Sequence, residues 1–266
     1  MGNIPMTAPD TCLRWSMPKP LDPETPSSEH DPLHDVLLGL SSCHKHRRWY
    51  ASLARPYLGS HPIEIGSGLG DYALEWLPHV EQLTLTDANP RWVQRLANRF
   101  SENATITVRQ LILPTSETGT HTSVIAYNVL EHISDHAQAL HSMIKLARVG
   151  SHIILICPAF PFAMNRLDID TGHFRRYTKN SISNLLASAN LRIVSVRYVN
   201  SIGLIAYYLS TKVLNRKITH GPLLIAYDYV LVPISRSLER IFGTPPFGQS
   251  VLAIAQVIAP PSEYHT

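Results

Sequence analysis

Short apolar segments alternate with longer amphipathic segments through the middle of the chain. Residues 62–66, 82–87 and 152–159 are apolar runs of the length that a buried strand needs. Residues 89–100 instead place their apolar side chains at helical spacing, along one face. Strands that alternate with helices of these lengths predict a parallel, doubly wound sheet with helices on both faces.

The same pattern gives bounds for the remaining elements. Further strands are expected at residues 105–113, 123–128, 191–199 and 249–258, and further helices at 71–77, 136–150 and 179–189. Gly150 is expected to end the helix that begins at His136, because glycine commonly follows the last turn of a helix. The core built from these elements is expected to span residues 61–200.

Composition separates the two ends of the chain from this core. Residues 1–30 hold six of the 20 prolines and little apolar periodicity, which predicts a disordered tail. Residues 31–60 are expected to form an N-terminal helical cap, since Asp31 and Pro32 are typical of a helix start. Residues 244–266 are expected to hold the last strand and a tail.

Residues 201–243 contain two apolar stretches before the last strand. Neither is a run of about 18 uncharged apolar residues, so no membrane-spanning helix is expected. Asp228 and Pro233 interrupt the second stretch, which favours a helical insertion that forms a lid or an interface. Peripheral contact with a membrane surface and formation of a homodimer stay open as alternatives for this segment.

The net charge and the cysteine content limit the classes of binding partner and the cellular compartments that are expected. The net charge of +3 and the pI near 8.8 are too weak and too scattered to predict a nucleic-acid partner. Cys12, Cys43 and Cys157 have neither metal-type nor C-x-x-C spacing, which suits a reducing compartment. The first residues lack the pattern of a secretory signal, so a cytoplasmic location is expected.

A glycine-rich turn follows the first strand of the predicted sheet. Gly66, Gly68 and Gly70 stand at every second position, where the missing Cβ atoms let a ligand approach the backbone. A dinucleotide fingerprint needs a third glycine where the chain has Asp71, and a P-loop needs a lysine that this turn lacks. The spacing therefore argues against both phosphate-binding loops.

Three carboxylates accompany this turn. Glu64 precedes the glycines and Asp71 follows them, so the turn is expected to repel a pyrophosphate and to attract a cation. Asp87 ends the second strand, where a carboxylate can bind both hydroxyl groups of a ribose. The predicted ligand is adenosine-like, positively charged and free of phosphate. S-adenosylmethionine meets each of these requirements.

These residues resemble the motifs of class I S-adenosylmethionine-dependent methyltransferases. The acidic glycine motif is "EIGSGLG" at residues 64–70, and "YNVLEHISD" at residues 127–135 is similar to the fourth-strand motif. The resemblance implies a Rossmann-like, doubly wound, seven-stranded α/β sheet, mostly parallel with a reversed last strand, and a helical insertion before that strand. It also implies S-adenosylmethionine as the cofactor. The residues expected to bind it are Glu64, Gly66, Ser67, Gly68, Gly70, Asp87, Ala88, Asn128 and Val129.

Two further expectations come from this resemblance. Members often carry an acid after the third strand, near the adenine amino group, but this chain has none there. The adenine is therefore expected to be bound by the backbone, by Gln110 or by another group. The N-terminal helix of the family often closes over the cofactor, so either Trp49 or Tyr50 is a candidate to cover it, unless this helix face only packs on the sheet.

The motif "TGHFRRYT" at residues 171–178 follows the fifth strand, where this fold places its acceptor. With "NVLEHI" it resembles a methyltransferase subgroup, similar to types 11 and 12, that has a GHxRRY signature. His173 is the first candidate for a general base, and His132 is the alternative. Glu131 is expected to stabilise a helix N-terminus. The residues expected to contact the acceptor are Asp168, Arg175, Arg176 and Tyr177.

Several of these residues have alternative roles. Arg175 and Arg176 can clamp a carboxylate, a phosphate or a polyol, or they can form a latch that holds the loop to the domain. His173 can contact the acceptor or shape the loop without acting as a base. Asp168 and Asp170 could hold a divalent metal together with His173, but this pattern is weak and no metal is expected.

The function that these features favour is methylation of a hydroxyl group in a saccharide, a glycan precursor or a natural product. The alternatives are methylation of nitrogen or carbon in a natural product or a lipid head group, and a non-catalytic protein that only binds the cofactor. The intact glycine motif with Glu64 and Asp87 argues against the last alternative. The expected partner is a small-molecule or saccharide acceptor.

Overall fold

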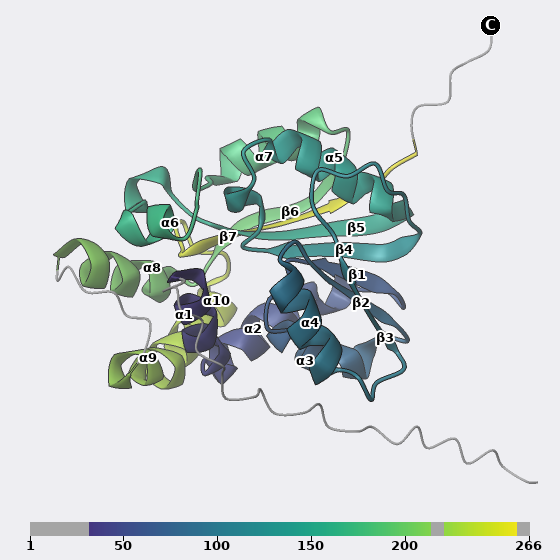
Figure 1. Ribbon diagram of the computed structural model, residues 1–266. Helices are drawn as coiled ribbons and strands as arrows, with labels where there is room; N and C mark the ends of the chain where they lie inside the picture. Colours follow the sequence, from purple (N-terminus) through teal and green to yellow (C-terminus); the bar gives the residue numbers. More distant parts are fainter. Residues whose placement is uncertain (1–31, 214–220, 260–266) are drawn as a thin grey trace, which may run out of the picture.

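The computed structural model describes residues 32–213 and 221–259 (Figure 1). The tail predicted for residues 1–30 and the last residues of the chain lie outside these ranges. The described residues form one seven-stranded sheet with the strand order β3-β2-β1-β4-β5-β7-β6. The strands are β1 Pro62–Ile65, β2 Leu83–Asp87, β3 Ile106–Gln110, β4 His121–Tyr127, β5 Ala147–Pro158, β6 Arg192–Val199 and β7 Ser250–Gln256.

The direction of the strands confirms the predicted fold class. Strands β1 to β5 pair in parallel, whereas β7 is antiparallel to both of its neighbours, β5 and β6. The strand order reverses between β1 and β4, and the loops that leave the carboxyl ends of these two strands flank that point. Ligands of open α/β sheets bind at such a reversal, so the fold places a site there.

Helices cover both faces of the sheet, and the period of two along β5 assigns each face (Figure 1). Ile153, Leu155 and Cys157 pack in a cluster with α5 and α7. Ile154 and Ile156 point the other way and pack with α2 and α3, while α4 joins α3 over β2. The bounds are α1 Pro32–Ser41, α2 His44–Ala54, α3 Asp71–Trp76, α4 Pro90–Arg99, α5 His136–Leu146 and α7 Lys179–Ser188.

The predicted helix 136–150 is too long. Helix α5 ends at Leu146, and Gly150 lies inside β5 with a φ of 87°. The Gly150 N–H donates to the Val257 carbonyl at 2.8 Å, just beyond the end of β7. Pairing with a strand more than 100 residues away therefore overrides the local helix signal.

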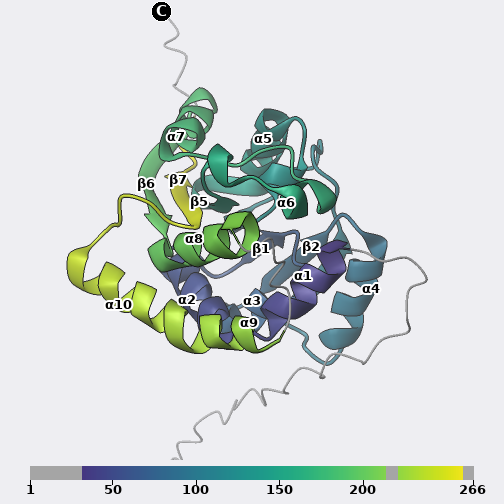
Figure 2. The same ribbon diagram turned by 90° about the vertical axis from the view of Figure 1, so that its left-hand side faces the viewer.

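The insertion consists of two helical stretches that lie beyond the carboxyl ends of the strands (Figure 2). The first is α8 Ser201–Tyr208, which continues as the π-helical segment η5 Leu209–Val213. The second is α9 Pro222–Ala226, the π-helical segment η6 Tyr227–Leu231, and α10 Val232–Phe242. None of the helices described is long and apolar enough to cross a membrane.

Asp228 in the π-helical segment fastens the insertion to the core. Its carboxylate accepts the backbone N–H groups of Lys45 and His46, at 3.0 and 2.7 Å. These are the second and third residues of α2, and the N-cap residue Cys43 makes no side-chain cap. Asp228 therefore supplies from a distance the N-terminal cap that α2 lacks locally.

Candidate active site

The glycine turn between β1 and α3 has a shape that only glycine adopts easily. Gly66, Gly68 and Gly70 have φ values of 68°, 52° and 71°. A Cβ on Gly66 would lie 2.7 Å from Val129, and one on Gly70 would lie 2.7 Å from Leu96 and Phe100. A Cβ on Gly68 would have its nearest neighbour at 3.5 Å. Two glycines thus serve close packing, whereas a Cβ on the middle one would make only ordinary contact with Leu37.

Asp87 holds this turn from the next strand. Its two carboxylate oxygens accept the backbone N–H groups of Gly68 at 3.0 Å and Asn89 at 2.9 Å. Burial raises the pKa of Asp87, and these hydrogen bonds partly offset that effect. Each oxygen keeps a lone pair, so the carboxylate can both fix the turn and accept further hydroxyl donors.

Glu64 is buried at the end of β1 with one carboxylate oxygen, Oε2, that has no hydrogen-bond partner among the described residues. Burial raises its pKa to about 8, while a hydrogen bond with Ser67 acts against this rise. An unpaired carboxylate in such a place is costly, and a cationic ligand group would relieve the cost.

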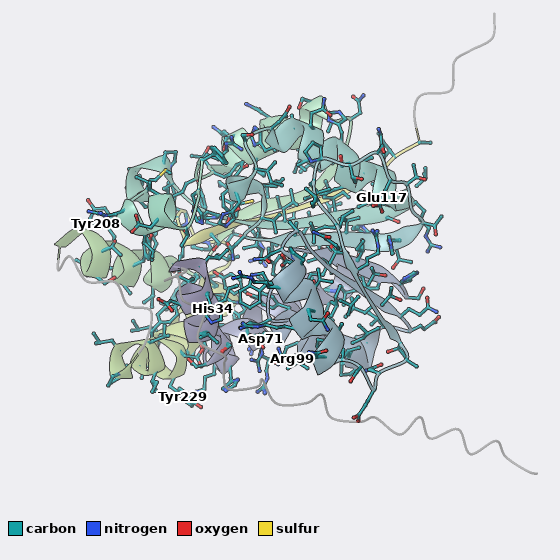
Figure 3. All side chains as sticks on the ribbon, viewed as in Figure 1. His34, Asp71, Arg99, Glu117, Tyr208 and Tyr229 are labelled. Carbon is teal, nitrogen blue, oxygen red and sulfur yellow. The ribbon has the colours of Figure 1, made fainter. Side chains whose placement is uncertain are left out.

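Asp71 adds less negative charge to the turn than the sequence suggests. Arg99 lies 3.0 Å from its carboxylate and also donates to the Leu69 carbonyl (Figure 3). The ion pair compensates the charge of Asp71. The attraction for a cation in this part of the site therefore rests on Glu64 and Asp87.

The remaining residues expected at the cofactor lie along the same strand ends. Ser67 links the turn to β2, since its N–H donates to the Thr86 carbonyl at 2.8 Å and its hydroxyl accepts the Thr86 N–H at 3.2 Å. Ala88 is exposed, and its carbonyl accepts the Gln110 side-chain amide at 2.8 Å. Asn128 is also exposed with a φ of 53°, and Val129 contacts Gly66.

Trp49 and Tyr50 occupy the core. Both are buried in the cluster that packs α2 and α3 against the sheet. The Tyr50 hydroxyl donates to Ser250 on β7 at 3.2 Å. Their positions match the alternative in which this helix face packs on the sheet.

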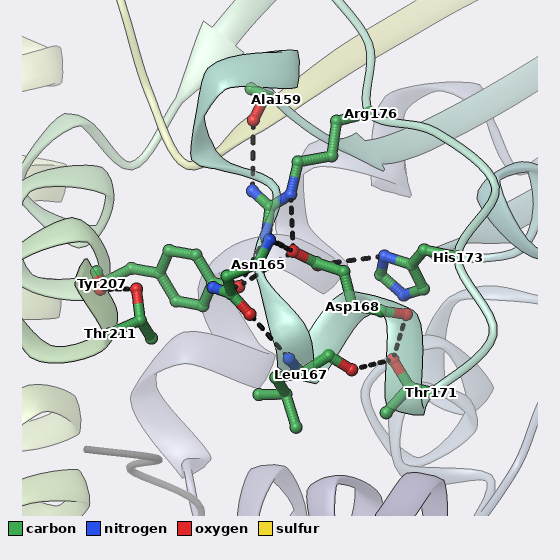
Figure 4. Close-up of polar contacts among 9 residues, drawn as sticks. All are labelled: Ala159, Asn165, Leu167, Asp168, Thr171, His173, Arg176, Tyr207 and Thr211. Atoms are coloured by element: carbon green, nitrogen blue, oxygen red, sulfur yellow. Dashed lines mark hydrogen bonds and ion pairs between the residues drawn. The ribbon is translucent and has the colours of Figure 1, made fainter. Parts of the chain in front are cut away.

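A buried ion pair organises the other half of the site, beside α6 Arg166–Asp170 (Figure 4). Arg176 donates from Nε and Nη2 to the two carboxylate oxygens of Asp168, at 3.1 and 2.7 Å. It also donates to the Ala159 carbonyl at 3.2 Å and to the Tyr207 hydroxyl at 2.7 Å. Both charged side chains are 4% exposed. The Arg176 guanidinium is therefore engaged by protein groups on every side.

His173 stands next to this pair. Its Nδ1 lies 3.1 Å from Asp168 Oδ1, within ion-pair distance, although the ring is not aligned for a full hydrogen bond. Burial opposes ionisation of Asp168, but its contacts with His173 and Arg176 outweigh this effect and lower its pKa to about 2. Asp168 is thus a carboxylate at neutral pH and faces the His173 ring. This leaves Nε2 of His173 as the nitrogen available to other groups.

Glu131 and His132 lie against His173 at the end of η3 Leu130–His132. The rings of His132 and His173 meet edge to face with centroids 4.5 Å apart. Burial, followed by the neighbouring His173, lowers the pKa of His132 to about 4. Glu131 is fully buried, neither carboxylate oxygen has a described hydrogen-bond partner, and burial raises its pKa to about 8.

Arg175 and Tyr177 bind the loop to the protein. Arg175 donates to the carbonyls of Ile133 at 2.5 Å and Ser134 at 2.7 Å. The Tyr177 hydroxyl is buried and lies 2.8 Å from Nδ1 of His136. The contacts of Arg175 are of the kind expected for the latch that the sequence offered for Arg175 and Arg176 as an alternative to acceptor binding.

The site also contains residues that the sequence did not single out. Tyr207 of α8 hydrogen-bonds Arg176 and Asn165, and it brings the insertion to the buried ion pair. Glu131 lies in the first turn of the short helix η3, at the helix entry where the sequence placed it, but the sequence did not indicate that its carboxyl group is buried without a partner. The available signal was an acid within the apolar run "NVLEHI", which is an unusual place for a charge.

Comparison with known proteins supports the family that the sequence motifs resemble. Residues 45–196, more than half of the chain, match a protein family described as a methyltransferase domain. A search of curated proteins by sequence finds no match.

Solved structures show the same fold at low sequence identity. A chain of the complex between the Haloferax volcanii Trm112 methyltransferase activator and a methyltransferase has a TM-score of 0.58 at 11% identity, covering 88% of this chain and 100% of that one. Geranyl diphosphate methyltransferase in complex with S-adenosylmethionine has a TM-score of 0.58 at 14% identity, covering 84% and 90%. The [4+2]-cyclase SpnF has the same TM-score and identity, covering 86% and 95%.

The residues at the glycine turn fit S-adenosylmethionine on chemical grounds. Glu64 provides an unpaired carboxylate for a cationic group, Asp87 provides acceptors for ribose hydroxyls, and Gly68 leaves space beside the backbone. The chain belongs to the methyltransferase-domain family, as a class I enzyme whose cofactor is S-adenosylmethionine.

Proposed function

We propose that this enzyme methylates a hydroxyl group of a saccharide, a glycan precursor or a natural product. The observation that carries the proposal is the pair of His132 and His173, backed by Asp168, on the loops that follow β4 and β5. A hydroxyl acceptor must lose a proton as it is methylated, and this pair offers ring nitrogens for that purpose.

The residues divide into two functional groups. When bound, S-adenosylmethionine supplies a methyl group on a positively charged sulfur, which leaves as a neutral thioether. Glu64 and Asp87 hold the cofactor, while Asn128 and Val129 lie at the end of β4 between the two groups. Because alignment accounts for much of such a displacement, the rigid strand ends are themselves part of the mechanism.

His173 is the proposed proton acceptor because Asp168 fixes its ring. With Nδ1 directed at the Asp168 carboxylate, Nε2 is left to take the proton of the acceptor hydroxyl. His132 is the alternative; its pKa of about 4 keeps the ring neutral at neutral pH but also makes it a weak base. Arg175, Arg176 and Tyr177 position this loop through the contacts already described.

Carbon or nitrogen methylation of a more apolar acceptor is the second candidate. Exposed apolar side chains of α8, Ile205 and Tyr208, stand near the acceptor side, and Tyr208 contacts the exposed Phe162. A carbon methyltransferase, CurJ, shares the fold with a TM-score of 0.51 at 14% identity. An acceptor with an apolar part would use these side chains.

Methyl transfer assays test the proposal directly. The enzyme would be incubated with S-adenosylmethionine carrying a labelled methyl group and with panels of hydroxyl, amine and carbon acceptors, and the product atom would be identified by NMR. We expect O-methyl products and a large loss of turnover in His173→Ala, with His141→Ala on the exposed face of α5 as the matched control. Products methylated only on nitrogen or carbon would contradict the hydroxyl assignment.

A further inference from the structure

Glu131 presents a buried carboxyl group for which the described protein provides no hydrogen-bond partner. Its side chain is fully buried, and neither oxygen accepts a hydrogen bond. A buried carboxylate is normally hydrogen-bonded, paired with a cation or bound to a metal ion. Glu131 therefore points to a ligand.

The nearest charged side chains do not supply that partner. Arg176 is 2.7 Å from Asp168 and donates both Nε and Nη2 to it, so these two charges cancel within one ion pair. His132 and His173 each place a potential ligand atom close to the Glu131 carboxyl group. When all three groups are deprotonated, the cluster offers a carboxylate and two imidazole nitrogens as ligands.

We propose that Glu131, His132 and His173 bind a divalent first-row transition metal ion. One carboxylate oxygen and one ring nitrogen of each histidine lie within 4.8 Å of one another. Metal–ligand distances of roughly 2.0–2.2 Å require these atoms to converge further, which small rotations of the three side chains can provide. Two imidazoles and a carboxylate suit manganese, iron, cobalt or zinc, and three protein ligands leave coordination positions open.

The surroundings of the two histidines are those of metal ligands. A metal-binding histidine usually donates its second N–H to a carboxylate or a backbone carbonyl. His173 has Asp168 at 3.1 Å, and the ring of His132 lies beside the backbone of Thr171 and Gly172. The sequence pattern suggests a metal only among His173, Asp168 and Asp170, because the ligands proposed here come from two loops that lie 41 residues apart in the chain.

The metal ion changes how the acceptor is activated, and this part of the inference rests on the proposed function. A hydroxyl oxygen that binds the ion becomes more acidic, and its proton passes to water. The electron pair left on oxygen then forms the new O–CH3 bond as the methyl–sulfur bond breaks. His132 and His173 are in this case ligands and not bases, so removal of the metal should abolish transfer.

Metal binding can be measured without any acceptor. The full-length protein would be treated with a chelator, exchanged into clean buffer and titrated with Mn2+, with the free ion followed by its EPR signal. We expect one Mn2+ per chain and displacement by Zn2+. Absence of saturable binding of both ions would overturn the proposal.

Variants separate this site from adventitious binding. Asp168→Asn should weaken Mn2+ binding about 10- to 100-fold through His173, and Glu131→Gln, His132→Ala and His173→Ala should weaken it further. His141→Ala is the matched histidine control and should bind like the wild type. Circular dichroism would confirm that each variant is folded. Equal loss in His141→Ala, or wild-type affinity in folded Glu131→Gln, would contradict the assignment.

The role in transfer has its own readout. With an acceptor that the enzyme methylates, chelation should abolish the reaction and Mn2+ should restore it. Full activity after chelation would refute a role in transfer and return His173 to the part of a base. If no hydroxyl acceptor is methylated but Mn2+ still binds at these residues, the proposed function fails and the metal site stands.

Discussion

Two buried glutamates on neighbouring strands invite comparison. Glu64 lies in β1, Glu131 follows β4, and these strands pair in parallel. Each is buried with at least one unpaired oxygen, and burial raises the pKa of each to about 8. Glu64 belongs to a turn of consecutive residues, whereas Glu131 meets side chains from a distant loop. The comparison teaches that a buried, unpaired carboxyl group can be surrounded by residues that are neighbours in the sequence, as at Glu64, or by residues from distant segments, as at Glu131.

The largest effect is expected from removing charge in each half of the site. Asp168→Ala leaves Arg176 buried without its partner and should cost about 3–5 kcal/mol of unfolding free energy. Asp71→Ala breaks a more exposed pair with Arg99 and should cost only about 1 kcal/mol. Urea denaturation, with Asp168→Asn as a milder variant, measures both. Similar losses of unfolding free energy in the two variants would show that the two ion pairs are equally solvated. This would contradict the expected difference between the two halves of the site.

Alanine substitutions in the glycine turn come next. Gly70→Ala places a Cβ 2.7 Å from Leu96 and Phe100 at a φ of 71°, so it should destabilise the fold by about 2–4 kcal/mol. Gly68→Ala meets Leu37 only at 3.5 Å and should cost about 1 kcal/mol. Its main effect should be on cofactor affinity, measured by calorimetry. A Gly68→Ala variant with unchanged affinity would show that the cofactor does not approach the backbone at this residue.

Asp87→Ala tests the local half of the site. It removes a carboxylate proposed to bind ribose hydroxyls and should weaken S-adenosylmethionine binding about 10- to 100-fold. Isothermal titration calorimetry measures the dissociation constant, with Glu81→Gln, an exposed residue before β2, as the control. Undiminished affinity in Asp87→Ala would refute the ribose assignment.

The smallest expected effect on cofactor affinity is the pH dependence that Glu64 confers. Its pKa of about 8 in the folded protein lies above the ordinary value of 4.5, so its protonated form is favoured by folding. The stability of the unliganded protein should therefore fall as the pH rises from about 5 through 8. A cationic ligand prefers the ionised form, so cofactor affinity should rise about tenfold between pH 6.5 and 8. A wild-type pH profile in Glu64→Gln would contradict this role.

The cofactor half could be predicted because its signals are local. The glycines, Glu64 and Asp87 stand at fixed positions relative to two strands, and the hydrophobic pattern locates these strands. The alternation of strands and helices also predicts the fold, which the structure confirms. The prediction that the helix ends at Gly150 was wrong, because this residue lies in β5 and hydrogen-bonds the backbone just beyond β7. Such long-range pairing cannot be read from the local sequence.

The acceptor half could be predicted only in part. The motif around His173 indicates which loop is functional. The sequence does not show that Arg176 is paired with Asp168 or that the Glu131 carboxyl group has no partner. These facts depend on the positions of three separate loops in the folded protein. Local patterns indicate which residues have functional chemistry, and tertiary contacts decide which groups remain free to use it.

The cap that Asp228 provides to α2 limits how this enzyme can be recombined. The insertion looks like an exchangeable part, since it is contiguous in the chain and begins after β6. Yet the first N–H groups of α2 depend on one carboxylate more than 180 residues away. A chimera that replaces the insertion to alter acceptor choice must therefore carry an acid at this position, or else redesign the start of α2 as well.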